Sequence, residues 1–195
     1  MPYNLVLASS SPFRQAVLDK LGLPFFCAAP DIDESAIPNE SIEEQVLRLA
    51  REKASALIDQ YPDSIIIGCD QLGSLAERVL GKPHTPEQAF TQLRASSGKC
   101  VTFHTGLAVY DGVNNQWHQR LDTYQVFFRE LTDDEIWGYI HKEQPLQCAG
   151  SFKSEGLGIT LFEKMAGDDP NTLVGLPLIA LSAILRKIGI NPLSD

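Results

Sequence analysis

The sequence predicts an α/β protein in which helices flank a mixed, twisted sheet. Three consecutive β-branched residues, Ile65–Ile67, are typical of a central strand that is buried on both faces. In the N-terminal half, short apolar segments alternate with helical patterns, which favours parallel strands. The turn-forming segment Asp111–Asn115 separates two further strand-like segments and adds a hairpin. A chain of 195 residues of this kind is expected to form a single domain over residues 1–195.

The first predicted strand covers residues 4–8 and leads directly into a helix over residues 12–21. Serines at the start of this helix can cap it, and a proline suits its first turn. Phe13, Val17 and Leu21 recur at helical spacing, so they predict the buried face of the helix.

The second predicted helix begins at Ser41, because Glu44 follows three residues later and completes a capping box. Lys53 falls on the apolar face of this helix with Ala50, whereas Arg48 falls on the outer face. A lysine on a buried face needs an acid or a ligand at its tip. A long side chain that reaches out to the surface is the commoner outcome, and the pattern leaves both interpretations open.

The central strand is followed by Gly68, Cys69, Asp70 and Gln71. We expect the strand to end here, which places a carboxylate at its C-terminal end, where open α/β sheets bind their ligands. The simpler interpretation is that Asp70 only opens a turn. This stretch alone does not separate the two.

The remaining elements follow from turn residues, caps and periodicity. We expect strands at 24–28, 100–110, 117–130 and 159–162, a hairpin at 72–80, helices at 86–96 and 133–142, a polar turn at 167–171, and a last helix that Gly175–Pro177 opens.

The composition excludes several classes of partner. The formal net charge is −9, so binding to nucleic acid or to an anionic membrane surface is not expected. The first residues lack the features of a signal peptide, and no apolar run is long enough to span a membrane. The four cysteines are widely spaced and show no metal-binding pattern, which is typical of reduced thiols. We therefore expect a cytoplasmic protein.

Four loops carry more polar residues than a turn needs. Residues 9–14 offer three hydroxyls and a guanidinium at a helix start, which suits phosphate, although such starts are common in any fold. The acidic loop at 31–34 could hold Mg²⁺ or could simply be solvated. The other two loops contain Asp70 and Gln71 with Lys82 nearby, and the segment Ser151–Gly156.

Taken in order, seven segments of the chain carry a specific pattern. They are Ala8–Arg14, Asp33–Glu34, Arg51–Ala54, Gly68–Gln71, Gly81–Pro83, Ala149–Gly156 and Asn171–Pro177. Together they resemble the Maf family of nucleotide pyrophosphatases over essentially the whole chain.

The resemblance implies an elongated, two-lobed α/β fold with a central cleft, similar to inosine triphosphate pyrophosphatases. It also implies cleavage of a nucleoside triphosphate between its α and β phosphates, with Mg²⁺ or Mn²⁺ as the cofactor. The implied roles are as follows: Asp70 is the general base or a metal ligand, Glu34 is a metal ligand, and Ser9, Ser11, Arg14, Lys53 and Lys82 bind phosphate.

Two positions direct the resemblance to the branch that hydrolyses 7-methyl-GTP. Phe13 stands where the commoner branch, specific for dTTP and UTP, has Arg, and Glu155 stands where that branch has Gln. An aromatic face attracts the positively charged 7-methylguanine ring, although tryptophan is more typical of this branch at position 13. A carboxylate can accept hydrogen bonds from guanine N1–H and N2–H, and Gln71 is expected to add to base or sugar recognition. The core-anchor role of Phe13 is the alternative to stacking.

The dTTP/UTP pyrophosphatase and a regulatory, septum-linked nucleotide-binding protein without turnover remain the alternatives to this function. The expected partner is a small nucleotide. Assembly as a homodimer and the identity of the physiological metal are left open by the sequence.

Overall fold

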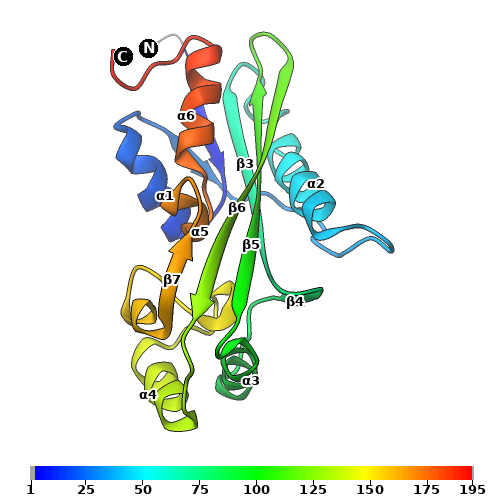
Figure 1. The fold of residues 1–195 in the computed structure, drawn as a ribbon. Coiled ribbons are helices and arrows are strands. Elements are labelled where there is room, and N and C mark those ends of the chain that lie inside the picture. Colours follow the sequence, from blue (N-terminus) through cyan, green and yellow to red (C-terminus); the bar gives the residue numbers. More distant parts are fainter. Residues whose placement is uncertain (1–2, 195) are drawn as a thin grey trace. The chain divides into compact units, whose positions relative to one another are not determined.

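A computed structural model describes residues 3–194 of the chain. Within these residues, the strands are β1 Leu5–Ala8, β2 Phe26–Ala28, β3 Ile65–Leu75, β4 Arg78–Leu80, β5 Cys100–Asp111, β6 Gln116–Phe128 and β7 Phe162–Ala166. The helices are α1 Pro12–Leu18, α2 Ile42–Ser55, α3 Pro86–Ser96, α4 Asp133–Glu143, α5 Pro170–Val174 and α6 Leu178–Lys187 (Figure 1). Short 3₁₀ helices are η1 Asp19–Leu21, η2 Ala149–Ser151 and η3 Leu157–Leu161.

The strands form one mixed sheet in the order β2-β1-β3-β5-β6-β7, and β4 pairs with β3. β1 is parallel to both β2 and β3, whereas the β3–β4 and β6–β7 pairs are antiparallel. The predicted fold class, a mixed α/β sheet with flanking helices, is thus confirmed. The chain divides into two compact units. Unit 1 comprises the chain up to Asp70, Thr105–Asp122 and the chain from Asp169 onward, and unit 2 comprises Gln71–His104 and Thr123–Asp168.

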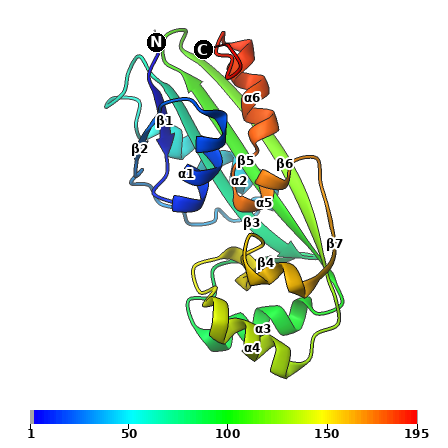
Figure 2. The ribbon, with the colours of Figure 1, turned by 90° about the vertical axis from the view of Figure 1, so that its left-hand side faces the viewer.

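Unit 1 has helices on both faces of its strands, with α1 and α6 on one face and α2 on the other (Figures 1 and 2). Alternation along β3 explains this arrangement, because successive side chains of a strand point to opposite faces. Ile65, Ile67 and Cys69 pack into a core with residues of α1 and α6. Ile66 packs instead with Ala54 of α2. The next two residues of that second face are positions 68 and 70.

Unit 2 has an aromatic core. Phe103, Phe128, Phe152 and Phe162 meet in edge-to-face contacts with ring centroids 4.9–5.6 Å apart. α3 and α4 lie side by side (Figures 1 and 2), and Phe90 of α3 stacks on Trp137 of α4 at 4.8 Å. This core fixes the segment that carries residues 151–156.

Several predicted boundaries are wrong. β3 does not end near Gly68 but runs on to Leu75, because residues 73–75 pair with β4, so Asp70 lies within a strand and not in a turn. The predicted strand at 159–162 is mostly the 3₁₀ helix η3, and β7 begins only at Phe162. The predicted polar turn at 167–171 contains the start of α5, which Asp169 caps by accepting a hydrogen bond from Asn171 N.

The predicted capping box of α2 is confirmed. Ser41 and Glu44 form a capping box at the start of α2, and Thr132 and Glu135 form another at α4. No helix within residues 3–194 combines the length and the apolar character that crossing a membrane requires.

Candidate functional site

The centre of the site is a buried ion pair between α2 and β3. Lys53 Nζ lies 2.6 Å from Asp70 Oδ1, and the two side chains are 7% and 8% exposed. Gly68 makes this approach possible, since a Cβ there would overlap Ala50 O and Ala54 N of α2. The helix therefore lies directly on the strand one turn before Lys53. The inward placement of Lys53 is confirmed, and its partner is an acid.

A second carboxylate reaches the same ammonium. Glu34 Oε1 lies 3.1 Å from Lys53 Nζ, and the Glu34 side chain is 59% exposed. One lysine thus neutralises an enclosed acid on the strand and an open acid on the preceding loop. The oxygens that Lys53 does not contact, Asp70 Oδ2 and Glu34 Oε2, are the ones that would receive a cation or a water molecule.

Arg48 anchors the loop that carries Glu34. Its guanidinium contacts Glu40 through Nε at 2.6 Å and Nη2 at 2.8 Å, Glu52 through Nη1 at 3.0 Å, and the backbone oxygen of Ser35 through Nη2 at 3.2 Å. The hydrogen bond to Glu40 raises the pKa of Arg48, and the same contact lowers the pKa of Glu40. Helical periodicity placed Arg48 on the outer face of α2, and nothing in the sequence indicated that the irregular loop folds back onto it.

The start of α1 brings three of the predicted phosphate-binding residues together. Ser11 Oγ caps the helix by accepting from Arg14 N, and Ser9 Oγ accepts from Ser11 N at 3.1 Å. Ser9 is buried. Phe13 is 39% exposed, so it does not anchor the helix in the core, and its predicted place on the buried face is wrong. The predicted burial of Val17 is confirmed, and its neighbour Leu18 is buried with it.

A backbone oxygen between α5 and α6 connects α1 to β3. Arg14 Nε donates to Gly175 O at 3.0 Å, and Cys69 Sγ donates to the same oxygen at 2.8 Å. Burial raises the pKa of Cys69 to about 11, which keeps the thiol protonated and able to donate near neutral pH. Cys69 precedes Asp70, so Arg14 and Asp70 belong to one connected set of contacts. In the sequence, Gly175 stands out only as part of the segment Asn171–Pro177, and nothing there indicates that its carbonyl accepts these two hydrogen bonds.

Three predicted site residues belong to unit 2: Gln71, which follows Asp70 on β3, Lys82 and Glu155. Lys82 and Glu155 are exposed, and Glu155 accepts a hydrogen bond from Ser154 Oγ at 3.2 Å. Burial raises the pKa of the Cys148 thiol, and the charges of Glu155 and Lys82 act on that thiol in opposite directions.

The loop that carries Glu155 is held by α4. Lys153 Nζ donates to Glu143 O at 2.7 Å, Lys153 N donates to Tyr139 Oη at 3.0 Å, and Leu157 N donates to Glu143 Oε1 at 3.1 Å. Burial raises the pKa of Tyr139 well above its ordinary value, so its hydroxyl stays neutral. The carboxylate of Glu155 is thus presented on an anchored loop.

The donor set fits a hard divalent cation that shares its ligands with a substrate. Residues 3–194 contain no group of three or more His, Cys, Asp or Glu side chains arranged as a complete metal site. Glu34 and Asp70 meet at Lys53, and Mg²⁺ is commonly bound by one or two carboxylates together with substrate phosphates and water. The carboxylates of Glu34 and Asp70 each use one oxygen to contact Lys53, so this pair matches the usual ligand set of Mg²⁺.

Comparison with solved structures finds proteins with a similar fold. The structure is similar to that of the Ham1 protein from Staphylococcus aureus, with a TM-score of 0.53 and 14% sequence identity over 95% of this chain and 99% of that chain. A weaker likeness, with a TM-score of 0.37 and 7% identity, joins 63% of this chain to 62% of the protein VC0702 from Vibrio cholerae. The first likeness concerns the fold alone, and the second is too weak to support an argument.

Comparison with family models gives a more specific result. The model described as Maf-like protein matches residues 4–188, which is nearly the whole chain. The match includes every residue of the site described above, from Ser9 to Gly175. The chain therefore belongs to the Maf-like protein family.

Proposed function

We propose that this protein is a nucleoside triphosphate pyrophosphatase that hydrolyses 7-methyl-GTP to 7-methyl-GMP and diphosphate. The observation that carries the proposal is the enclosed Lys53–Asp70 pair with Glu34 beside it. Phosphoryl transfer depends on positioning and on neutralising charge more than on covalent chemistry. A carboxylate fixed within a strand, a buried ammonium and nearby hydroxyl and guanidinium donors supply both.

In the proposed reaction a water molecule attacks the α-phosphorus, and the bond from that phosphorus to the oxygen bridging it to the β-phosphate breaks. Asp70 accepts the proton of the attacking water through Oδ2, while Lys53 holds Oδ1 and orients the carboxylate. Diphosphate is the leaving group. Arg14, Ser9 and Ser11 bind phosphate oxygens, and Lys53 and Lys82 offset the charge of the triphosphate.

A divalent cation, Mg²⁺ or Mn²⁺, would be held by Glu34 and Asp70. When bound, it would neutralise negative charge on the phosphates as the leaving group departs. Asp70 can serve as its ligand, as the general base, or as both in turn.

The proposed base recognition uses Phe13 and Glu155. The exposed ring of Phe13 is available to stack on a cationic 7-methylguanine, and the exposed carboxylate of Glu155 is available to accept hydrogen bonds from its N1–H and N2–H groups. Gln71, next to Asp70, completes the recognition of the base or sugar. The proposed partner is a small nucleotide substrate.

Product analysis tests the reaction. Incubation with 7-methyl-GTP and Mg²⁺ should release diphosphate and 7-methyl-GMP, and GTP, dTTP and UTP should be turned over more slowly. Asp70→Asn should lower turnover at least about a hundredfold, because it removes the proton acceptor. Asp59→Asn, an exposed acid of the same unit, is the matched control and should leave turnover unchanged. Release of orthophosphate would contradict the proposed bond cleavage, and a preference for dTTP or UTP would support the alternative substrate.

The same panel of nucleotides tests the proposed base recognition. Glu155→Gln should reduce the preference for 7-methyl-GTP over GTP by about tenfold while Mg²⁺-dependent turnover remains, because one charge-assisted acceptor becomes an amide. Glu163→Gln, an exposed acid in β7, is the control. An unchanged ratio of the two kcat/KM values would exclude Glu155 from base recognition.

A further inference from the structure

The carbonyl oxygen of Gly175 accepts two hydrogen bonds from different elements. One donor is Arg14 Nε on α1 at 3.0 Å, and the other is Cys69 Sγ on β3 at 2.8 Å. Arg14 belongs to the proposed phosphate site, and Cys69 is the residue before Asp70. One backbone atom therefore connects the guanidinium to the strand that carries the carboxylate.

The backbone at Gly175 requires glycine. Its φ of +107° lies in the left-handed region, where side chains are disfavoured. A Cβ at this position would also lie 3.2 Å from Arg14 Nε and 3.7 Å from Arg14 Nη2. Any side chain here would press on the guanidinium as well as strain the turn.

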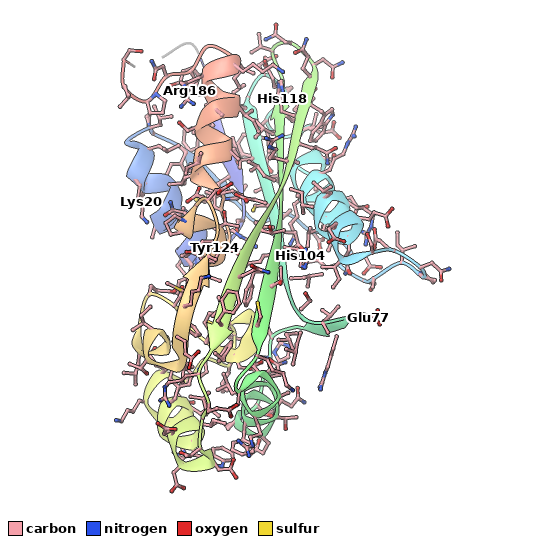
Figure 3. All side chains as sticks on the ribbon, viewed as in Figure 1. Lys20, Glu77, His104, His118, Tyr124 and Arg186 are labelled. Carbon is pink, nitrogen blue, oxygen red and sulfur yellow. The ribbon has the colours of Figure 1, made fainter. Side chains whose placement is uncertain are left out.

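The turn that presents this oxygen is itself anchored on several sides. Asp169 accepts hydrogen bonds from Asn171 N at 2.8 Å and from Ile179 N at 2.7 Å, which joins α5 to α6. Thr172 Oγ1 donates to Asp122 Oδ2 at 2.8 Å. Lys20, which extends from the segment after α1 (Figure 3), donates to Asn171 Oδ1 at 2.7 Å. These contacts all lie within unit 1 and fix the position of the Gly175 carbonyl.

A guanidinium held in this way has a defined direction. Nε is occupied by Gly175 O, so Nη1 and Nη2 are the groups that remain to donate to phosphate oxygens, in the paired geometry that guanidinium groups favour. We propose that Gly175 is a positioning residue for Arg14: its carbonyl fixes the guanidinium beside β3 so that Nη1 and Nη2 point at the phosphates of the substrate. The inference rests on the proposed phosphate-binding role of Arg14.

A ligand-free measurement tests the positioning itself. In the wild-type protein the Nε–H group of Arg14 should give a slowly exchanging NMR signal, identified by its loss in Arg14→Lys. Gly175→Ala should shift this signal and speed its exchange. Gly189→Ala is the matched control, because Gly189 also has a positive φ, +89°, and a Cβ there meets nothing within 4 Å. A signal that Gly175→Ala leaves unchanged would overturn the proposal whatever reaction the protein catalyses.

Binding of inorganic pyrophosphate with Mg²⁺, measured by calorimetry, tests whether the positioned guanidinium of Arg14 contributes to phosphate binding. Gly175→Ala should weaken binding about tenfold, comparable to the loss of one hydrogen bond to a charged group. Gly189→Ala should leave it unchanged. The double variant Gly175→Ala with Arg14→Ala should bind no worse than Arg14→Ala alone, because both changes remove one interaction. Additive losses would overturn the proposal.

If Gly175→Ala does not fold, the variant Arg14→Lys tests the positioning of the guanidinium. Lysine keeps the positive charge but has no planar guanidinium, so one nitrogen cannot be held at Gly175 O while two others face phosphate oxygens in a fixed paired geometry. We expect its pyrophosphate affinity to fall nearly as far as that of Arg14→Ala, and an affinity equal to wild type would overturn the proposal. Failure of the proposed reaction is distinguishable, since in that case the wild-type protein binds no pyrophosphate and releases none from nucleotides, while the Arg14 signal still responds to Gly175→Ala.

Discussion

Lys53 and Asp70 depend on each other for their burial. Each side chain is less than a tenth exposed, and an ionised group in such a place is stable only with a partner of opposite charge. Helical periodicity predicted that Lys53 faces inward and that it needs an acid, but it could not name the acid. Asp70 was singled out because the central strand was expected to end beside it, whereas the residue lies within β3.

Removal of the lysine alone should therefore cost stability as well as activity. Lys53→Met leaves the Asp70 carboxylate enclosed without a counter-charge, and we expect a loss of about 3 to 5 kcal/mol in the free energy of unfolding measured with urea. The double variant Lys53→Met with Asp70→Asn should recover most of this loss. Lys187→Met, at an exposed position of α6, should change the free energy by no more than about 0.5 kcal/mol. Equal stability of Lys53→Met and the wild type would show that the pair contributes nothing to folding.

At the scale of elements, caps and periodicity predicted most of the helices, whereas long-range pairing decided where the strands end. The Ser41–Glu44 capping box is a local interaction, so sequence alone locates it. The continuation of β3 past Asp70 depends on pairing with β4. The place of the Glu34 loop depends on Arg48, and no local pattern encodes this contact. The residue types of the site were thus predictable from the sequence, but the contacts that assemble them were not.

Loss of the Arg48 anchor should weaken metal binding. Arg48→Ala frees the loop at Ser35, next to Glu34, and we expect the Mn²⁺ concentration needed for half-saturation, measured by electron paramagnetic resonance, to rise about tenfold. Arg51→Ala is the control on the same helix, because the guanidinium of Arg51 lies over the Trp117 ring, 4.8 Å from its centroid. Equal Mn²⁺ affinity in Arg48→Ala and the wild type would mean that the loop holds Glu34 without the arginine.

At the scale of the molecule, the chain passes between the two units several times, and β3, β5 and β6 each contribute residues to both. Neither unit is a continuous piece of sequence. The single domain predicted from the length of the chain stays a prediction, and it can be tested because each unit contains one of the two tryptophans.

Trp117 reports on unit 1 and Trp137 on unit 2. Trp117 packs against Tyr110 at 4.9 Å, and Trp137 packs against Phe90 at 4.8 Å. We expect urea unfolding curves of Trp117→Phe and Trp137→Phe, each followed by the fluorescence of the remaining tryptophan, to have the same midpoint after correction for the stability of each variant by circular dichroism. Separate transitions would show two independently folding units.

The alternation of β3 has one further consequence. A slip of this strand by a single residue would exchange its two faces: the Cys69 thiol would turn to the side of α2, and the Asp70 carboxylate would turn to the side that packs against α1 and α6. It would also replace the glycine that α2 needs with a side chain too large for the space. The pairing register that buries the apolar side chains of β3 is therefore the same register that places the proposed catalytic acid beside Lys53. An insertion or deletion of one residue in the segment before Ile65 would have to be absorbed entirely by the loop, or the protein would lose its fold and the proposed activity together.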